Sequence, residues 1–218
     1  MDNLYIRIPT VNGLWQGWLA TPTESQVKAL TQDELEAIMA TKAANMRISL
    51  LLPTSSCVMT SVNVTRQQLK QLSEPDIAYL IEEQVLGSVE QLQCVYQSLN
   101  EHQALVLGIQ DSVLKELIEP FKGITGELVT AVPDIFLLPH NPQGWSLLVD
   151  NTDCWLRLNE AWGVRLEANS AIALLDSAWN EFPSSHIQVY GEIPKGVVGC
   201  SRKNDRRKFS SLRLDTTI

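Results

Sequence analysis

Three strand-like segments in close succession constrain the fold of this chain more than any other feature. Strands are predicted at three segments that lie close together in the chain: 145–150, 154–158 and 162–166. Asn169 is placed to cap a helix that extends to about Phe182, and residues 186–190 resemble a fourth strand. The predicted order is therefore three strands, a helix and a strand, which requires a mixed α/β architecture.

This order is the core of one ribonuclease-H-like half, the unit that actin-like proteins carry twice. The N-terminal region resembles a shortened first copy. It contains a predicted hairpin (4–8 and 14–20) and a helix that begins after a capping box formed by Thr31 and Glu34 and runs to about Ala44. A buried strand, 47–52, follows and ends at Pro53. The duplication is inferred from element order alone.

A separate βαββα unit is predicted between the two halves. Strands are expected at 57–64, 92–99 and 104–109, and a helix at 111–121. Thr65 and Gln68 form a second capping box. We expect Ser73 to start a further helix, with Pro75 in its first turn and its end near Val85.

The apolar residues of this further helix fall on one face. They are Ile77, Leu80, Ile81 and Val85. Glu82, Glu83 and Gln84 are consequently expected to point outward.

The predicted fold class is α/β, an actin-like (ribonuclease-H-like) two-lobed fold with an inserted βαββα sub-domain and a degenerate nucleotide site. The predicted division has four parts: 1–56 as the first lobe, completed by 128–144; 57–127 as the insert; 145–200 as the second lobe; and 201–218 as a basic juxtamembrane segment.

Charge is distributed unevenly along the chain. The formal net charge is −8 and the isoelectric point is near 4.9, which argues against a nucleic-acid partner. Residues 201–218 carry six basic residues and two acids, a net of +4, so residues 1–200 carry −12. The basic residues are Arg202, Lys203, Arg206, Arg207, Lys208 and Arg213. This end is either a solvated tail or a juxtamembrane segment that binds anionic lipid headgroups, at about 1 kcal/mol per basic residue.

The sequence gives no catalytic, cofactor-binding or metal-binding residues to name. Actin-like ATPases bind phosphates with Asp-x-Gly turns, but the turn at 8–13 lacks the aspartate and the turn at 150–153 lacks the glycine. The four cysteines and three histidines do not occur at metal-ligand spacing. Glu82 and Glu83 are adjacent on a helix, so they do not converge on one substrate. We therefore predict a protein that is not an enzyme and needs no cofactor.

Five short motifs carry a family resemblance. In chain order they are Leu50–Pro53, Tyr79–Gln84, Val132–Asp134, Leu137–Pro139 and Trp145–Asp150. Their order and spacing resemble those of the type II secretion system protein L family, over about residues 46 to 175. Two positions depart from the family pattern: Ala78 replaces a usual proline, and the acidic run that follows is reduced to residues 86–90.

The resemblance implies an actin-like cytoplasmic domain without enzymatic activity, in a protein with a single membrane helix in the inner membrane. Such a scaffold binds the N-terminal domain of the secretion ATPase and the inner-membrane platform proteins of the same system, and a homodimer is compatible with this role. The expected partner-binding residues are Glu82, Glu83, Gln84 and Glu90. Two alternatives stay open at this point: an actin-like nucleotide-binding ATPase, and a type IV pilus assembly scaffold.

Overall fold

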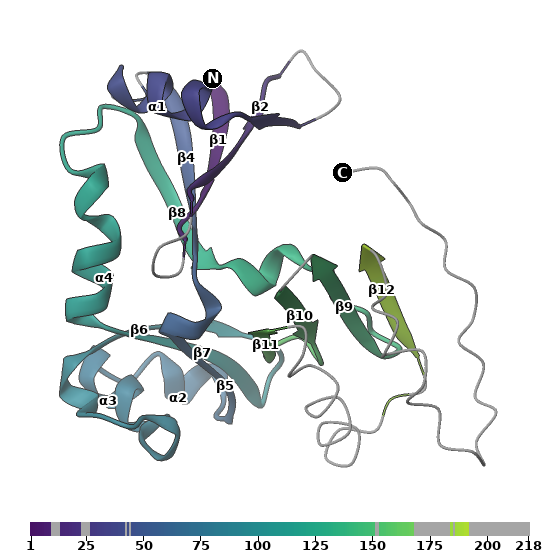
Figure 1. Cartoon of the computed structure of the whole chain (residues 1–218). Helices are drawn as coiled ribbons and strands as arrows, with labels where there is room; N and C mark the ends of the chain where they lie inside the picture. The colour runs from purple at the N-terminus through teal and green to yellow at the C-terminus, as the bar shows by residue number, and fades with distance from the viewer. Residues whose placement is uncertain are drawn as a thin grey trace. The chain divides into compact units, whose positions relative to one another are not determined.

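The computed structural model describes residues 1–9, 14–22, 27–41, 43, 45–150, 153–167, 184 and 186–191. The chain forms two compact units, Met1–Asp134 and Ile135–Thr217. Figure 1 shows the course of the chain and the labels of its elements.

A five-stranded sheet is the base of the first unit. Its strands are β1 (Asp2–Arg7), β2 (Gln16–Ala20), β3 (Lys28–Leu30), β4 (Met46–Leu52) and β8 (Glu127–Pro133). They lie in the order β3-β2-β1-β4-β8. β2 pairs antiparallel with β1 and β3, whereas β1, β4 and β8 are parallel. The carboxyl ends of three strands therefore meet at one edge of this sheet.

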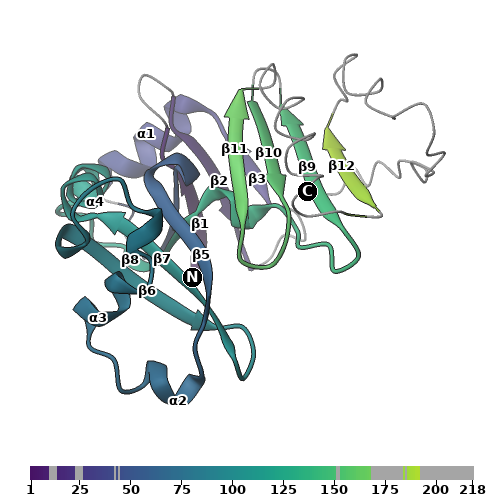
Figure 2. The same cartoon turned by 90° about the horizontal axis from the view of Figure 1, so that it is seen from below.

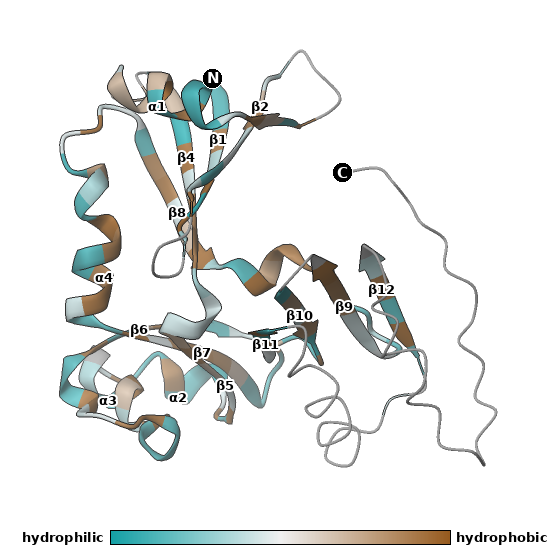
Figure 3. Ribbon diagram, viewed as in Figure 1, coloured by the Kyte–Doolittle hydropathy of each residue, from teal (hydrophilic) through white to brown (hydrophobic). Residues whose placement is uncertain are grey.

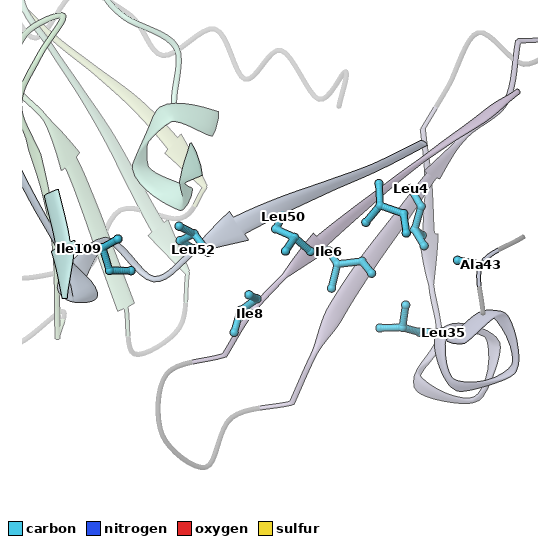
Figure 4. Packing of buried hydrophobic residues seen from close by; sticks show 9 residues of the cluster. Leu4, Ile6, Ile8, Leu35, Ala43, Leu50, Leu52 and Ile109 are labelled. Carbon is cyan, nitrogen blue, oxygen red and sulfur yellow. The ribbon is translucent and has the colours of Figure 1, made fainter. Parts of the chain in front are cut away.

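The core of the first unit lies on one face of this sheet. Leu4, Ile6 and Leu50 are completely buried there, and Leu35 packs against the same cluster (Figure 4). Leu35 belongs to α1 (Gln32–Ala40), which begins at the predicted capping box: the Glu34 N–H donates to Thr31 Oγ1 at 3.3 Å. α4 (Asp111–Ile118) also contributes apolar side chains to this cluster, and Figure 3 shows its alternating polar and apolar surfaces.

A three-stranded antiparallel sheet is inserted between β4 and β8. It consists of β5 (Cys57–Asn63), β7 (Gln103–Gln110) and β6 (Leu92–Ser98), in that order, with β7 in the centre. Two short helices lie on one side of it, α2 (Arg66–Leu69) and α3 (Glu74–Tyr79), as Figures 1 and 2 show. The capping box of Thr65 and Gln68 is present at the start of α2. The inserted sheet is followed by α4, which leads to β8.

The second unit contains the predicted succession of three antiparallel strands. These are β9 (Trp145–Asp150), β10 (Asp153–Arg157) and β11 (Gly163–Glu167), and β12 (Ile187–Gly191) joins β9 in parallel. The sheet order is β11-β10-β9-β12, and Trp145, Leu147 and Leu156 form its buried core. The helix predicted at 169–182 lies outside the described residues.

Two predicted helix ends were wrong. α1 ends at Ala40 rather than Ala44, because Ala43 and Asn45 adopt positive φ angles of 48° and 60° that a right-handed helix does not contain. The helix expected to reach Val85 ends at Tyr79, and residues Glu82–Gln84 form a separate 3₁₀ turn, η2. The four-part division of the chain stays a prediction.

Candidate functional site

The four residues predicted to bind a partner lie in the segment that joins α3 to β6. Glu82, Glu83 and Gln84 form η2, and Glu90 lies in the 3₁₀ turn η3 (Val89–Gln91). All four side chains are exposed. The predicted outward orientation of Glu82, Glu83 and Gln84 is therefore correct, although they lie in a 3₁₀ turn instead of on a helix face.

Buried apolar residues anchor both ends of this segment to the inserted sheet. Ile77 and Ile81 precede the acidic residues, Val89 lies next to Glu90, and all three pack in one cluster with Val106 of β7. Ile81 is fully buried. The segment that carries the exposed acids is thus anchored by buried residues on both sides.

A capping box fixes the start of α3. The Ser73 backbone N–H and hydroxyl both donate to Asp76 Oδ2, at 3.0 and 2.6 Å. The hydrogen bond from the Ser73 hydroxyl, and then that from the Ser73 backbone, lower the pKa of Asp76. The charged form of Asp76 is consequently favoured in the folded protein, and its contribution to α3 is lost as the pH falls through that lowered pKa.

The region around this segment contains only one sign of charge. Residues 71–114 include seven acids and neither lysine nor arginine. Within the part of the chain that the structure describes, Glu82, Glu83 and Glu90 form no salt bridge, whereas exposed acids such as Glu119 and Glu127 pair with Lys122 and Arg47. The segment is therefore an unneutralised negative surface.

Large apolar side chains are also exposed in this part of the chain, between residues 79 and 96, and the sequence patterns did not predict them. Tyr79 is 50% exposed, Leu86 is fully exposed, and Val95 and Tyr96 on β6 are 63% and 41% exposed. Tyr79 was part of a motif that carried the family resemblance, but nothing in its spacing distinguished it from a core residue. A surface that combines exposed apolar groups with unpaired acids is suited to binding another protein.

The structure also reveals a buried polar cluster at the carboxyl ends of β1, β4 and β8. Arg7 Nε donates to Asp134 Oδ2 at 3.0 Å. The Thr54 backbone N–H and hydroxyl donate to Asp134 Oδ1 at 3.1 and 2.5 Å. The Asp134 side chain is 1% exposed. Its carboxylate joins the end of the first-lobe sheet to η1 (Thr54–Ser56), where the inserted sheet begins.

The sequence signal for this cluster was Val132–Asp134, a motif that carried the resemblance but received no role. The cluster also sets the chemistry of a neighbouring thiol. Burial, and secondarily the negative charge of Asp134, raise the pKa of Cys57 to about 12. Since the thiolate is the nucleophile, this raised pKa makes Cys57 a poor nucleophile at neutral pH.

Other predicted positions lie partly or wholly outside the described residues. Residues 10–13 and 151–152, in the two turns compared with phosphate-binding turns, are among these, as are Arg202, Lys203, Arg206, Arg207 and Lys208. Within the described ranges, no group of three or more His, Cys, Asp or Glu residues could hold a metal ion. No described helix combines the length and apolar character needed to cross a membrane.

Comparison with known proteins identifies the family. The sequence profile of "Type II secretion system (T2SS), protein L" matches residues 6–212. The chain belongs to the type II secretion system protein L family. The protein L of Dickeya chrysanthemi is 27% identical over 169 residues, which cover 77% of the chain and 41% of that protein. A putative protein L of Escherichia coli K12 is 23% identical over 212 residues, covering 94% of the chain and 52% of that protein.

These relatives are longer, since the chain spans about half of their length or less. Solved structures agree on the fold of this protein L chain. The cytoplasmic domain of EpsL, an inner-membrane component of the type II secretion system of Vibrio cholerae, superposes with a TM-score of 0.73 at 19% identity, covering 89% of the chain and 84% of that domain.

A Bacteroides thetaiotaomicron protein with an actin-like ATPase fold and unknown function gives a TM-score of 0.55 at 12% identity, covering 90% of the chain and 84% of that protein. The predicted actin-like α/β fold and the predicted protein L family are therefore both confirmed.

Proposed function

We propose that this chain is a cytoplasmic scaffold that holds the secretion ATPase at the inner membrane by binding the ATPase N-terminal domain. The observation that carries the proposal is the segment between α3 and β6, where unpaired acids and exposed apolar side chains are fixed by buried anchors. A rigid surface loses little conformational entropy on binding, so it suits a lasting protein contact better than a mobile loop would.

The scaffold role does not need catalysis. The hydrogen-bonding capacity of the Asp134 carboxylate is used by Arg7 and Thr54, and Cys57 is held as a thiol. These are the polar groups that the structure gathers where three parallel strands end, the edge at which open α/β sheets commonly bind ligands. Because Arg7 and Thr54 both donate hydrogen bonds to Asp134, these three residues support a structural role for this edge of the sheet.

The test of ATPase binding is to change Glu82, Glu83 and Glu90 together to alanine. These exposed charges contribute little to folding, so the free energy of unfolding should stay within about 0.5 kcal/mol. The free energy of binding to the N-terminal domain of the secretion ATPase, measured by calorimetry, should weaken by about 2 to 5 kcal/mol if the acids are desolvated on binding, and by less if they lie at the rim.

The matched control removes three exposed acids elsewhere, Glu36, Glu116 and Glu167, all of which are exposed. It lowers the negative charge equally and should leave affinity nearly unchanged. If both variants bound the ATPase domain as tightly as the unchanged protein, the ATPase contact would lie on another surface.

Trp155 of the second unit is poorly suited to be the centre of such another surface, because its ring is buried beneath the Arg165 guanidinium.

We further propose that the basic C-terminal end binds anionic lipid headgroups, beside platform proteins of the same secretion system. Changing Arg206, Arg207 and Lys208 to glutamine should weaken binding to vesicles of anionic phospholipid at low salt by about a hundredfold, since each basic residue adds about 1 kcal/mol. Co-sedimentation at rising salt measures this, because screening reduces the attraction.

The control for vesicle binding replaces Lys28, Lys115 and Lys122 by glutamine, which removes the same charge from the first unit. If both variants lost binding equally, general charge and not the C-terminal end would explain the attraction.

A further inference from the structure

Strand β6 is an edge strand whose outer side is unpaired in the described chain. It bonds only to β7, in register from Leu92↔Gln110 to Ser98↔Ala104. In an antiparallel pair every second residue directs its N–H and C=O away from the neighbouring strand. Among the described residues, no backbone hydrogen bond reaches this outer side of β6. β6 therefore offers a row of backbone donors and acceptors to another strand.

The side chains of β6 lack the features that usually prevent such pairing. Natural edge strands carry charges, prolines or bulges that block an approaching strand. The seven residues Leu92–Ser98 contain no charge and no proline, and their pairing with β7 is regular. Val95 and Tyr96 are among the most exposed apolar side chains of the described chain. This edge is therefore exposed and able to pair with another β-strand.

The charge around β6 indicates what kind of strand can add there. Glu90 lies just before the strand and Glu101 just after it, and Glu82 and Glu83 precede it in η2. Residues 71–114 include no lysine or arginine, and Lys115, just beyond them, is paired with Asp111. The unpaired charges that border β6 in the chain are therefore negative. A segment with its own lysine or arginine residues is therefore attracted, and an acidic segment is repelled.

We propose that β6 is the docking edge of this surface, where the partner adds an extended, basic segment as a fourth strand of the inserted sheet. The inference rests on the proposed function, because it names how the ATPase N-terminal domain would be bound. Backbone hydrogen bonds would supply affinity, while Val95 and Tyr96 would contact apolar side chains of the added strand. Glu90 and Glu101, before and after β6, would favour an added strand that carries basic residues.

A second copy of this chain is the less suitable occupant. Antiparallel pairing of two β6 strands would bring Glu90 of one copy toward the turn that contains Glu101 of the other. Like charges at such close range oppose association. The charge pattern thus favours a different, basic chain.

The test changes Val95 to lysine and measures binding of the ATPase N-terminal domain. The new charge lies on the exposed edge, so the melting temperature should not change, whereas the affinity should fall by about tenfold or more through repulsion of a basic strand. Leu128→Lys is the matched control, since Leu128 is 51% exposed on β8, an edge strand of the five-stranded sheet. It should bind as the unchanged protein does.

Hydrogen exchange of the complex gives a second readout. Peptides that cover 92–98 should gain protection when the ATPase domain is added, and peptides that cover 127–133 should not. Suppose that the unchanged protein and Val95→Lys bind the ATPase domain with equal affinity, with no protection of β6 in the complex. That result would overturn the proposal that β6 is the docking edge, but not the proposed function. No binding by the unchanged protein would overturn the proposed function itself. A dimer in sedimentation velocity that Val95→Lys converts to a monomer would show a second copy as the occupant and overturn the proposal of a basic partner.

Discussion

Replacing Asp134 by alanine should lower the free energy of unfolding by about 3 to 5 kcal/mol. The reason is the cluster that this carboxylate completes. Its removal leaves the Arg7 side chain, only 14% exposed, without its ion pair, and takes the acceptor from the Thr54 N–H and hydroxyl. Urea unfolding followed by circular dichroism measures the loss.

Two comparisons separate the ion pair from the other bonds of Asp134. Asp134→Asn keeps an acceptor for Thr54 but loses the charge opposite Arg7, so its cost should lie between those of the unchanged protein and Asp134→Ala. In a double-mutant cycle, Arg7→Ala combined with Asp134→Ala should cost less than the sum of the single changes. Strict additivity would show that the two side chains do not act as a pair.

An exposed ion pair provides the control. Glu119→Ala removes the partner of Lys122, and both side chains are more than half exposed. Exposed pairs contribute about 0 to 1 kcal/mol, so this variant should be nearly as stable as the unchanged protein. If Asp134→Ala lowered the free energy of unfolding as little as Glu119→Ala, the buried cluster would have no structural role. The motif 132–134 would then need another explanation.

The sequence was most informative where local chemistry decides structure. The capping boxes at Thr31, Thr65 and Ser73 use only contacts within four residues, so their helix starts were predicted correctly. The buried strand before Pro53 was likewise clear, because Ile48 and Leu50–Leu52 are apolar and Pro53 ends the strand. The order of three strands in the second unit led to the prediction of an actin-like fold, which the solved structures of similar fold support.

Contacts between distant residues could not be read from the sequence in the same way. Arg7, Thr54 and Asp134 are far apart in the chain and meet only because three parallel strands end together. The edge position of β6 depends on sheet order, which alternation within one strand does not contain. The helix predicted to reach Val85 failed for a related reason. A short helix has little stability of its own, so the packing of Ile81 and Val89 against the sheet determines where α3 ends.

Replacing Ile81 by alanine should lower the free energy of unfolding by about 2 to 5 kcal/mol. Ile81 is fully buried between α3 and β7 and directly precedes the acidic turn η2. Its loss leaves a cavity and removes one of the buried residues that anchor the proposed docking surface. Leu86→Ala is the control, because Leu86 lies five residues further along and is fully exposed, so its change should cost less than about 0.5 kcal/mol.

Gly108 provides a sharper test of the same contact. A methyl group at Gly108 would lie 2.9 Å from Ile81 Cδ1, which is closer than packed carbon atoms come. Gly108→Ala should therefore cost about 1 to 3 kcal/mol by overpacking, and Ile81→Val about 0.5 to 1.5 kcal/mol by the loss of that Cδ1. The double variant removes the clashing atom, so it should be more stable than the sum of the single changes predicts, by about 1 kcal/mol. Chemical unfolding of the four proteins measures this coupling. Additive effects would mean that Ile81 does not pack against Gly108, and the position of η2 would then need a different anchor.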